Sequence, residues 1–489
     1  MAISFRCAGC GASMPADASG PYPFRCPASG PGDDVDHVVH RAFGTNGGPL
    51  PEATEPDPFV RYRALLSSHA VALSRGVSDE AYTALVRDLG AAVGRVDGAG
   101  FRETPFRPWP ALGERLGFSR GEVWVKDETG DVAGSHKARH LMGIMLHLLV
   151  RDPAAPAGPD CRPTDPGRAD LAIASCGNAA LAAAVIARAA DWPLRVFVPP
   201  SVDAAVIARL QALGARIEVC ERETGVMGDP AHVAFRRAVD AGAIPFCCQG
   251  PDNGLTIEGG ETLAWEMVSA FRQAGARQWG ATRLDAVFIQ VGGGALASAI
   301  IQGFGEAQAA GTVDRLPRFY TVQTSGAYPL KRAYDELAAR ILMRIPLVVG
   351  QGFSPAADRE RADLIASHPT LVDEELSEAR RHRSRFMQPW YKEPRSIAHG
   401  ILDDETYDWA AVVEGMLRTG GWPLVVSEDR LVEANVLARD VTGIPVDHTG
   451  SAGLAGLMKA TGLDRRLADE RVALIFSGVD RQALPSATT

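Results

Sequence analysis

One lysine in this sequence, Lys137, stands where a covalent nucleophile could be made. The spacing predicts a short strand over Glu122–Val125, a turn-rich loop with two glycines over Thr129–Ser135, and a helix over Ala138–Leu149. Lys137 therefore lies where the loop enters the helix, close to free backbone N–H groups and to the positive end of the helix dipole. This position favours the free amine, which is the form of lysine that makes a Schiff base. The alternative is a solvated lysine in a first helical turn.

A second segment that could do chemistry is the turn Ser175–Asn178, which reads Ser-Cys-Gly-Asn. It follows a short apolar stretch, Leu171–Ala174, that predicts a strand, and it precedes an alanine-rich helix predicted over Ala179–Ala190. A strand, a turn of small residues and a helix N-terminus together present free N–H groups to an anion, most naturally a substrate carboxylate. Asn178 adds a side-chain donor. Alone, the turn is better explained as a plain connection between a strand and a helix.

Three consecutive glycines, Gly292–Gly294, follow an apolar strand predicted over Val287–Val291 and precede another predicted helix. Glycines let the backbone approach a phosphate, and successive N–H groups at a helix start bind it. The same glycines, with Ala297, also satisfy a dinucleotide-binding fingerprint. That interpretation needs an acidic residue about 20 positions further on, and the next predicted strand, Phe319–Ser325, ends without one. The phosphate of a different cofactor is therefore favoured.

These three segments occur in the order found in the pyridoxal-phosphate enzymes of fold type II, the tryptophan-synthase-β group, and the sequence resembles threonine synthase-like members most. The pattern K-x-E, a turn, then G-S-x-K-x-R is matched by Lys126, Glu128, Gly134, Ser135, Lys137 and Arg139. The turn itself differs, because Asp131–Ala133 replace the family's usual Asn-Pro-Thr. A further match is Ser477-Gly478, which follows a buried strand predicted over Val472–Phe476.

The resemblance implies a role for each candidate site residue. Lys137 would carry the cofactor as a Schiff base and remove the α-proton of the substrate. The substrate carboxylate would lie on the turn made by Ser175, Cys176, Gly177 and Asn178. Cofactor contacts would come from Asn178 at the phenolic oxygen, from Gly292, Gly293, Gly294, Ala295 and Leu296 at the phosphate, and from Ser477 at the pyridine nitrogen. A neutral hydroxyl there makes the ring a weaker electron sink than a carboxylate would, which favours expulsion of a leaving group over racemisation or transamination.

The predicted function is a pyridoxal 5'-phosphate-dependent elimination or replacement at the β or γ carbon of a small amino-acid substrate, by a threonine synthase-like lyase. A serine/threonine ammonia-lyase or a β-replacement synthase of specialised metabolism is the alternative, because no binding constellation for a substrate phosphate stands out. From a different class, the chain could be a non-catalytic cofactor-binding regulator, although the intact Lys137, Asn178 and Ser477 argue against this. A nicotinamide oxidoreductase is disfavoured by the missing ribose-binding acid.

The N-terminal cysteines suggest a metal site. Cys7 and Cys10 form a C-x-x-C pair, and Cys26 supplies a third thiol. A structural zinc needs four soft ligands in tetrahedral positions, and His37 could complete a set of three cysteines and one histidine. The alternative is three cysteines without a metal. Disulfides are not expected, because adjacent cysteines such as those at 247–248 cannot bridge without severe strain.

Composition narrows the class of protein further. The chain has 489 residues, 46% of them apolar, which is enough for two or three domains with sizeable cores. Fifty basic and 59 acidic residues give a net charge of −9, which argues against nucleic acid and anionic membranes as partners. No apolar run approaches the ~18 residues of a membrane span, and Met1–Arg6 does not begin a signal peptide. We therefore expect a soluble cytoplasmic protein, and the resemblance implies a homodimer.

The motifs suggest a division of the chain into an α/β architecture of two doubly wound parallel-sheet domains behind a small extension. Residues 1–50 are the extension with the possible zinc site, and residues 51–120 are a helical lead-in. Residues 121–242 are predicted as the smaller domain, with Lys137 and the Ser175–Asn178 turn. Residues 243–489 are predicted as the larger domain, with the glycine loop and Ser477. Within it, residues 326–410 contain no motif to which we assign chemistry.

Overall fold

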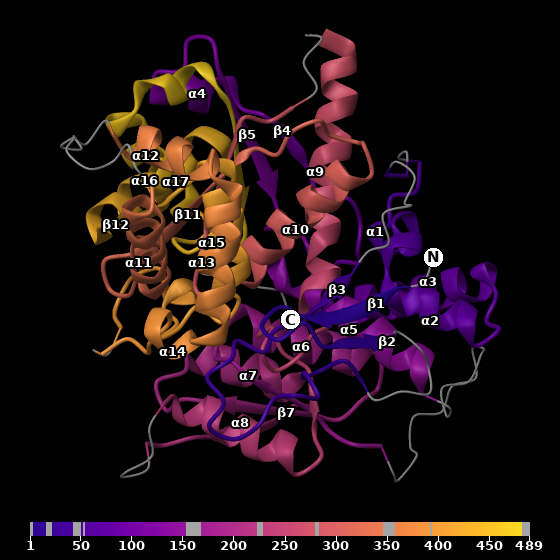
Figure 1. Ribbon diagram of the computed structural model, residues 1–489. Helices are drawn as coiled ribbons and strands as arrows, with labels where there is room; N and C mark the ends of the chain where they lie inside the picture. The colour runs from indigo at the N-terminus through magenta and orange to yellow at the C-terminus, as the bar shows by residue number, and fades with distance from the viewer. Residues whose placement is uncertain are drawn as a thin grey trace.

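The chain folds into two parallel-sheet units and a small N-terminal sheet, as the computed structural model in Figure 1 shows. The structure describes residues 3–15, 22–42, 50–51, 54–152, 168–222, 228–278, 283–345, 357–391 and 394–481. Among these residues, no helix is both long and apolar enough to cross a membrane.

The larger sheet has six strands in the order β12-β11-β10-β13-β5-β4. They are β4 (Phe106–Pro108), β5 (Glu122–Asp127), β10 (Ala286–Gln290), β11 (Arg318–Thr324), β12 (Pro423–Val426) and β13 (Arg471–Phe476). All neighbours pair in parallel except β4 and β5. Every residue of β10 is buried, and β11 and β13 are buried after their first residue. Nearly continuous apolar runs of this kind are required when helices cover both faces of a sheet.

The smaller sheet has four parallel strands in the order β8-β7-β6-β9. They are β6 (Leu171–Ala174), β7 (Leu194–Val198), β8 (Arg216–Val219) and β9 (Ile244–Pro245). Parallel neighbours need crossover connections, which α6 (Asn178–Ala189), α7 (Ala204–Ala212) and α8 (Pro230–Asp240) provide. These elements form the lower part of the view in Figure 1.

Two long helices, α5 (Lys137–Arg151) and α9 (Thr256–Gln278), pack against each other. They approach each other closely at Gly143 and Gly259. A Cβ atom at Gly143 would lie 2.9 Å from the Cα atom of Gly259, so only glycine allows this spacing. On its other side α9 packs against α10 (Ala295–Ala309), the helix that follows the glycine loop.

The remaining helices surround this centre. Between α10 and the C-terminus the chain adds α11 (Pro329–Met343), α12 (Ala357–Ala366), α13 (Pro369–Arg381), α14 (Arg383–Phe386), α15 (Trp409–Thr419), α16 (Glu428–Thr442) and α17 (Ala452–Leu463), and α4 (Pro110–Leu116) precedes β5. The orange and yellow part of Figure 1 shows most of them grouped around the larger sheet.

The N-terminal region forms a separate three-stranded antiparallel sheet in the order β2-β1-β3. Its strands are β1 (Ser4–Cys7), β2 (Ser13–Pro15) and β3 (Val39–Ala42), and the helices α1 (Pro58–Arg61), α2 (Ser67–Ser74) and α3 (Asp79–Asp97) follow. The side chain of Ser78 caps α3 by accepting a hydrogen bond from Ala81 N at 3.2 Å.

The predicted α/β fold with two parallel sheets is confirmed, but the strand before Lys137 belongs to the larger sheet. The residues of β5 pair with β13 from Glu122 opposite Arg471 to Asp127 opposite Phe476. The strand therefore does not join β6–β9, although it falls inside the predicted smaller domain of residues 121–242. The proposed domain boundaries themselves stay a prediction. Sequence spacing could not reveal this pairing, because the two partner strands are almost 350 residues apart.

Candidate active site

A cavity of about 340 Å³ lies at the carboxyl ends of β6, β10 and β13, where loops of both parallel sheets meet. Open α/β sheets bind their ligands at this edge. We call this space the inner cavity. It is lined by all eleven residues predicted to bind the cofactor or the substrate carboxylate, namely Lys137, Ser175, Cys176, Gly177, Asn178, Gly292, Gly293, Gly294, Ala295, Leu296 and Ser477.

Lys137 is the first residue of α5, one position earlier than predicted, and it borders the inner cavity. His136 is the N-cap residue of this helix. Within the described parts of the chain, no carboxylate oxygen comes within 4.0 Å of Lys137 Nζ. An amine that faces a cavity without a carboxylate partner is available to a ligand carbonyl.

A fully buried cluster of charges holds the first turns of α5 in place. Arg139 donates from Nε to Glu128 and from Nη1 to Glu266, at 2.7 Å each. Lys126 Nζ also bonds to Glu266 and donates to the carbonyl oxygen of Thr104 at 2.8 Å. The cluster therefore joins β5, α5, α9 and the segment before β4. Lys126, Glu128 and Arg139 are the residues of the sequence signature, and the structure places them behind the site as its support.

One further acid, Asp131, lies beside this cluster. Asp131 lies 3.4 Å from Arg139 Nε, and burial raises the pKa of its carboxyl well above the usual value although Arg139 acts against this. For Glu266, burial opposes ionisation, but Arg139 and Lys126 outweigh it and lower the pKa. The cluster thus pairs Lys126 and Arg139 with Glu128 and Glu266, and buried ionisable groups require such partners.

The turn predicted to hold a carboxylate leads directly into α6. The first hydrogen bond of this helix runs from Leu181 N to Gly177 O at 3.1 Å. The amides of Asn178 and Ala179 precede it and have no acceptor within the helix. Both residues line the inner cavity, so these N–H groups can bind an anion there.

The glycine loop has the same property at the start of α10. The first helical hydrogen bond runs from Ser298 N to Gly294 O at 2.9 Å, so the amides of Ala295 and Leu296 have no acceptor within the helix. Gly294 has φ +99°, a left-handed conformation that favours glycine. This loop therefore fits a phosphate group.

A segment to which the sequence assigned no chemistry, residues 399–408, packs against the glycine loop. Thr406 Oγ1 donates to Gly292 O at 3.0 Å, and Asp408 N donates to Gly293 O at 3.1 Å. Residues 399–403 of this segment also line the inner cavity. No sequence signal marked it, because the segment has neither a glycine-rich pattern nor regular spacing of apolar residues.

Asp403 is the charged residue of this segment that lies closest to the glycine loop. A Cβ atom at Gly292 would lie 2.3 Å from Asp403 Oδ2. Burial raises the pKa of Asp403 to about 6, although Lys137 acts in the opposite direction. The carboxyls of Asp229 and Asp404 also raise this pKa. The protonation state of Asp403 therefore changes near neutral pH at the edge of the anion site.

Ser477 follows β13 and is only 2% exposed. Its Oγ accepts a hydrogen bond from His136 N at 3.1 Å and lies 2.5 Å from His136 Nδ1. Among the described residues, the cavity thus combines an unpaired amine, two sets of free amides and one buried hydroxyl. This donor set fits pyridoxal phosphate, which presents an aldehyde carbon, a phosphate and a ring nitrogen.

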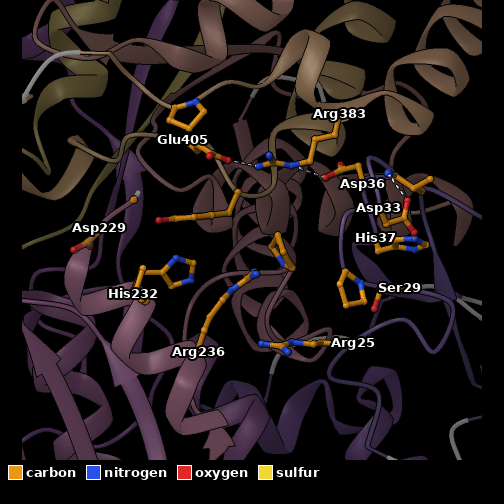
Figure 2. A pocket seen from close by; sticks show the side chains of 18 of the residues that line it. Arg25, Ser29, Asp33, Asp36, His37, Asp229, His232, Arg236, Arg383 and Glu405 are labelled. Carbon is orange, nitrogen blue, oxygen red and sulfur yellow. Dashed lines mark hydrogen bonds and ion pairs between the residues drawn. The ribbon is translucent and has the colours of Figure 1, made fainter. Parts of the chain in front are cut away.

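A larger cavity of about 730 Å³ adjoins the inner one and shares Asp229, His232 and Tyr407 with it. Figure 2 shows this outer cavity, with arginine side chains on its walls. Because the two spaces share lining residues, they lie next to each other.

One wall of the outer cavity is the N-terminal loop of residues 25–37. Arg25 pairs with Asp240 of α8 at 3.2 Å and with Asp252 at 3.4 Å. On the opposite side, Asp36 pairs with Arg383 Nε at 3.2 Å (Figure 2). The loop is therefore bonded to both sides of the outer cavity.

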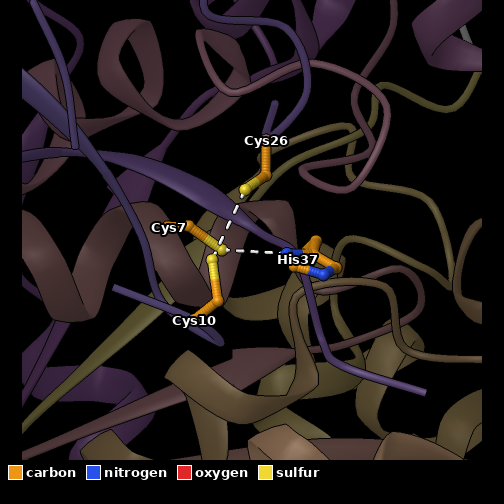
Figure 3. A group of neighbouring side chains, drawn as sticks. All are labelled: Cys7, Cys10, Cys26 and His37. Carbon is orange, nitrogen blue, oxygen red and sulfur yellow. Dashed lines mark hydrogen bonds between the residues drawn. The ribbon is translucent and has the colours of Figure 1, made fainter. Parts of the chain in front are cut away.

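The four predicted metal ligands, Cys7, Cys10, Cys26 and His37, lie together at the base of this loop (Figure 3). Their ligand atoms are all within 4.8 Å of one another, with Cys7 Sγ 3.4 Å from His37 Nδ1 and Cys10 Sγ 3.5 Å from Cys26 Sγ. Ligands about 2.3 Å from a tetrahedral zinc lie roughly 3.8 Å apart, so this spacing fits the metal. Asp33 Oδ2 lies 2.7 Å from His37 Nε2. Carboxylates commonly form such a hydrogen bond to the second ring nitrogen of a metal-bound histidine.

The family to which the chain belongs follows from comparison with known sequences. The sequence model of the family described as pyridoxal-phosphate dependent enzyme matches residues 99–388, more than half of the chain. The chain therefore belongs to this family. The matched region includes Lys137, the Ser175–Asn178 turn and the glycine loop.

Individual relatives agree with this assignment. The chain is 23% identical to a threonine synthase of Mycobacterium leprae over 73% of this chain and 75% of that protein. It is 29% identical to a serine dehydratase-like protein of Rattus norvegicus over 41% of this chain and 52% of that protein. The structure of threonine deaminase isoform 2 from Solanum lycopersicum has the same fold, with a TM-score of 0.52, 17% identity, and coverage of 82% of this chain and 90% of that one.

The predicted family is confirmed, and the predicted cofactor and enzyme class agree with it. The match covers 42% of the threonine synthase of Methanocaldococcus jannaschii and 75% of that of Mycobacterium leprae. The rest of each relative lies outside the alignment. Bound zinc and the role of each site residue stay predictions.

The buried charge cluster leads to a prediction about stability. We expect Arg139→Met to lower the free energy of unfolding by about 3–5 kcal/mol, because it leaves Glu128 and Glu266 buried without their main partner. The matched control is Arg430→Met, which breaks the exposed pair with Glu433. This variant should change the free energy of unfolding by less than about 1 kcal/mol. Urea unfolding of both variants measures the difference. Equal effects would contradict the central role of the cluster.

The position of Asp403 leads to a prediction about pH. Above a pKa of about 6 its carboxylate is ionised and repels a phosphate on the glycine loop, so we expect pyridoxal-phosphate affinity to fall as the pH rises through 6. The Asp403→Asn variant should bind pyridoxal phosphate about tenfold more tightly than wild type at pH 8, and with the same affinity as wild type at pH 5.

This prediction is measured by titrating apoprotein with pyridoxal phosphate and following absorbance. Asp404→Asn is the matched control, because this neighbour lines the outer cavity only. The cofactor phosphate titrates in the same range, and that contribution is common to every variant. Parallel pH profiles for wild type and Asp403→Asn would rule out the repulsion.

Proposed function

We propose that this protein is a pyridoxal-phosphate enzyme that eliminates or replaces a β or γ substituent of a small amino acid. The observation that carries the proposal is the amine of Lys137, which faces one cavity with two sets of free helix-start amides and the hydroxyl of Ser477. When bound, pyridoxal phosphate supplies an electron sink for the bonds at the α-carbon of the amino acid.

We assign a separate role to each group of residues in the inner cavity. The amides at Ala295 and Leu296 bind the cofactor phosphate, and those at Asn178 and Ala179 bind the substrate carboxylate. Lys137 Nζ would hold the cofactor, and once the amino group of the substrate has taken its place the freed amine would take the proton from the substrate α-carbon. Ser477 offers the ring nitrogen a neutral hydroxyl, which favours loss of a leaving group over racemisation.

Threonine synthesis from O-phosphohomoserine is the first candidate reaction, supported by the similarity to threonine synthases over most of the chain. Serine or threonine deamination is the second, supported by the similarity to serine dehydratase-like proteins over a shorter region. Both reactions begin with removal of the α-proton, so the presence of Lys137 does not distinguish between them. Replacement chemistry in specialised metabolism and a non-catalytic cofactor-binding role are the remaining alternatives.

We also propose that Cys7, Cys10, Cys26 and His37 hold a structural zinc ion, with Asp33 orienting the histidine. Zinc would keep the N-terminal loop in position as a wall of the outer cavity. A homodimer and a cytoplasmic location stay predictions.

The covalent role of Lys137 is tested by reduction with borohydride. We expect wild-type protein to trap pyridoxal phosphate irreversibly, and Lys137→Ala to trap none and to lose activity by at least about a thousandfold. Lys331→Ala, which removes a partly exposed lysine paired with Asp335, should trap cofactor like wild type. Mass spectrometry of the reduced protein identifies the modified residue. A link retained in Lys137→Ala would move the nucleophile elsewhere.

The same purified protein distinguishes the candidate reactions. Absorbance is followed while serine, threonine, O-acetylserine, O-phosphoserine, cysteine and O-phosphohomoserine are added in turn, and products are analysed. Threonine and phosphate from O-phosphohomoserine support the synthase, whereas a 2-oxo acid and ammonia from serine or threonine support the lyase. Cofactor binding without any product would favour the regulator.

The zinc proposal predicts a change in substrate affinity rather than in cofactor binding. Cys10→Ser should lose bound zinc and raise the KM for the active substrate several-fold, because the loop that it anchors lines the outer cavity. Cys220→Ser, outside the cluster, is the control. Elemental analysis, KM and trapped cofactor are measured together. The absence of zinc in wild-type protein purified without chelator would remove the proposal.

A further inference from the structure

The histidine next to the reactive lysine makes an unexpected contact. His136 is 9% exposed, lines the inner cavity and packs edge-on against His140, with their ring centroids 5.7 Å apart. Its Nδ1 atom lies 2.5 Å from Ser477 Oγ, and its backbone N donates to the same oxygen at 3.1 Å. The residue before Lys137 is therefore bonded twice to the hydroxyl that we assign to the ring nitrogen.

The hydrogen-bonding capacity of the hydroxyl limits what this contact can be. A serine hydroxyl has one proton and two lone pairs, and the backbone N–H of His136 takes one lone pair. If Nδ1 carries a proton, it takes the second lone pair, and the hydroxyl proton is left to point into the cavity. If Nδ1 is bare, it accepts the hydroxyl proton, and Ser477 can then only accept a hydrogen bond from a ligand.

The surroundings of His136 favour the first arrangement. Burial lowers the pKa of its ring well below the usual value, so the ring is neutral with one proton. Its Nε2 is buried and has no partner among the described residues. A buried acceptor without a partner is tolerated better than a buried N–H without one. The proton therefore belongs on Nδ1.

We propose that His136 is a positioning residue that donates from Nδ1 to Ser477 and thereby directs the serine hydroxyl proton into the inner cavity as a donor to the cofactor ring nitrogen. The inference rests on the proposed function, because it assumes that Ser477 faces that nitrogen. A ring nitrogen that receives a hydrogen bond stays unprotonated. His136 thus keeps the electron sink weak, the state that favours elimination.

The tautomer of His136 is the first test and needs no cofactor. In wild-type apoprotein with 15N-labelled histidine, long-range 15N–1H NMR distinguishes a protonated Nδ1 from a protonated Nε2. We expect His136 to carry its proton on Nδ1. His140 is an internal reference, since its Nδ1 faces the carbonyl oxygen of Thr256 at 2.8 Å and must donate to it. A proton on Nε2 of His136 would overturn the proposal.

Two matched variants give the second test. His136→Asn keeps an amide N–H near the position of Nδ1, whereas His136→Gln moves the amide to the position of Nε2. The 15N shift of the ring nitrogen in bound, labelled pyridoxal phosphate should match wild type in the asparagine variant. In the glutamine variant it should move toward that of a nitrogen without a hydrogen bond, and affinity should fall about tenfold.

The outcomes separate this inference from the proposed function. If wild-type protein neither binds pyridoxal phosphate nor links it to Lys137, the proposed function fails and this inference fails with it. If the link forms in wild type but the asparagine and glutamine variants give the same ring-nitrogen shift, only the role of His136 is refuted. A protonated ring nitrogen in wild type refutes that role as well.

Discussion

The ion pairs of Arg139 with Glu128 and Glu266 are the constraint on which the rest of the site depends. The guanidinium is fully buried and bonds to acids from two different elements, so β5 and α9 must both approach α5 at this point. Removal of either partner would leave a charge without compensation in the interior, which costs several kcal/mol. Because Lys137 begins the same helix two residues earlier, this cluster also determines where the amine stands.

In the function that we propose, backbone groups around this amine would bind the ligands and side chains would control the protons. Both anion sites are helix starts at the carboxyl ends of parallel strands, one from each sheet. Amides of this kind bind negative charge without adding a titratable group. The groups that do titrate or carry protons, Asp403, Ser477 and His136, lie at the edges of these sites. In the proposed function, these groups would adjust the charge of the cofactor from there.

The N-terminal extension connects this chemistry to the approach of the substrate. Its loop forms a wall of the outer cavity and is bonded to both sides of it through Arg25 and Asp36. The cluster of Cys7, Cys10, Cys26 and His37 lies at the base of that loop. A metal in this cluster would act far from the reacting atoms and still affect which substrates reach them, because it holds the wall in place.

The sequence by itself determined the α/β class, the family and the three loops of the site, because each loop is a local pattern of a strand, small residues and a helix start. It also placed the four metal-ligand candidates, since cysteine pairs are recognisable from spacing alone. The tertiary structure alone decided that β5 joins the larger sheet, that Glu266 completes the cluster of Arg139, and that Asp403 and His136 line the inner cavity. These contacts join positions from about 110 to 350 residues apart. Local propensity cannot select among the many acids and hydroxyls of the chain, so only packing decides which distant partner meets each buried group.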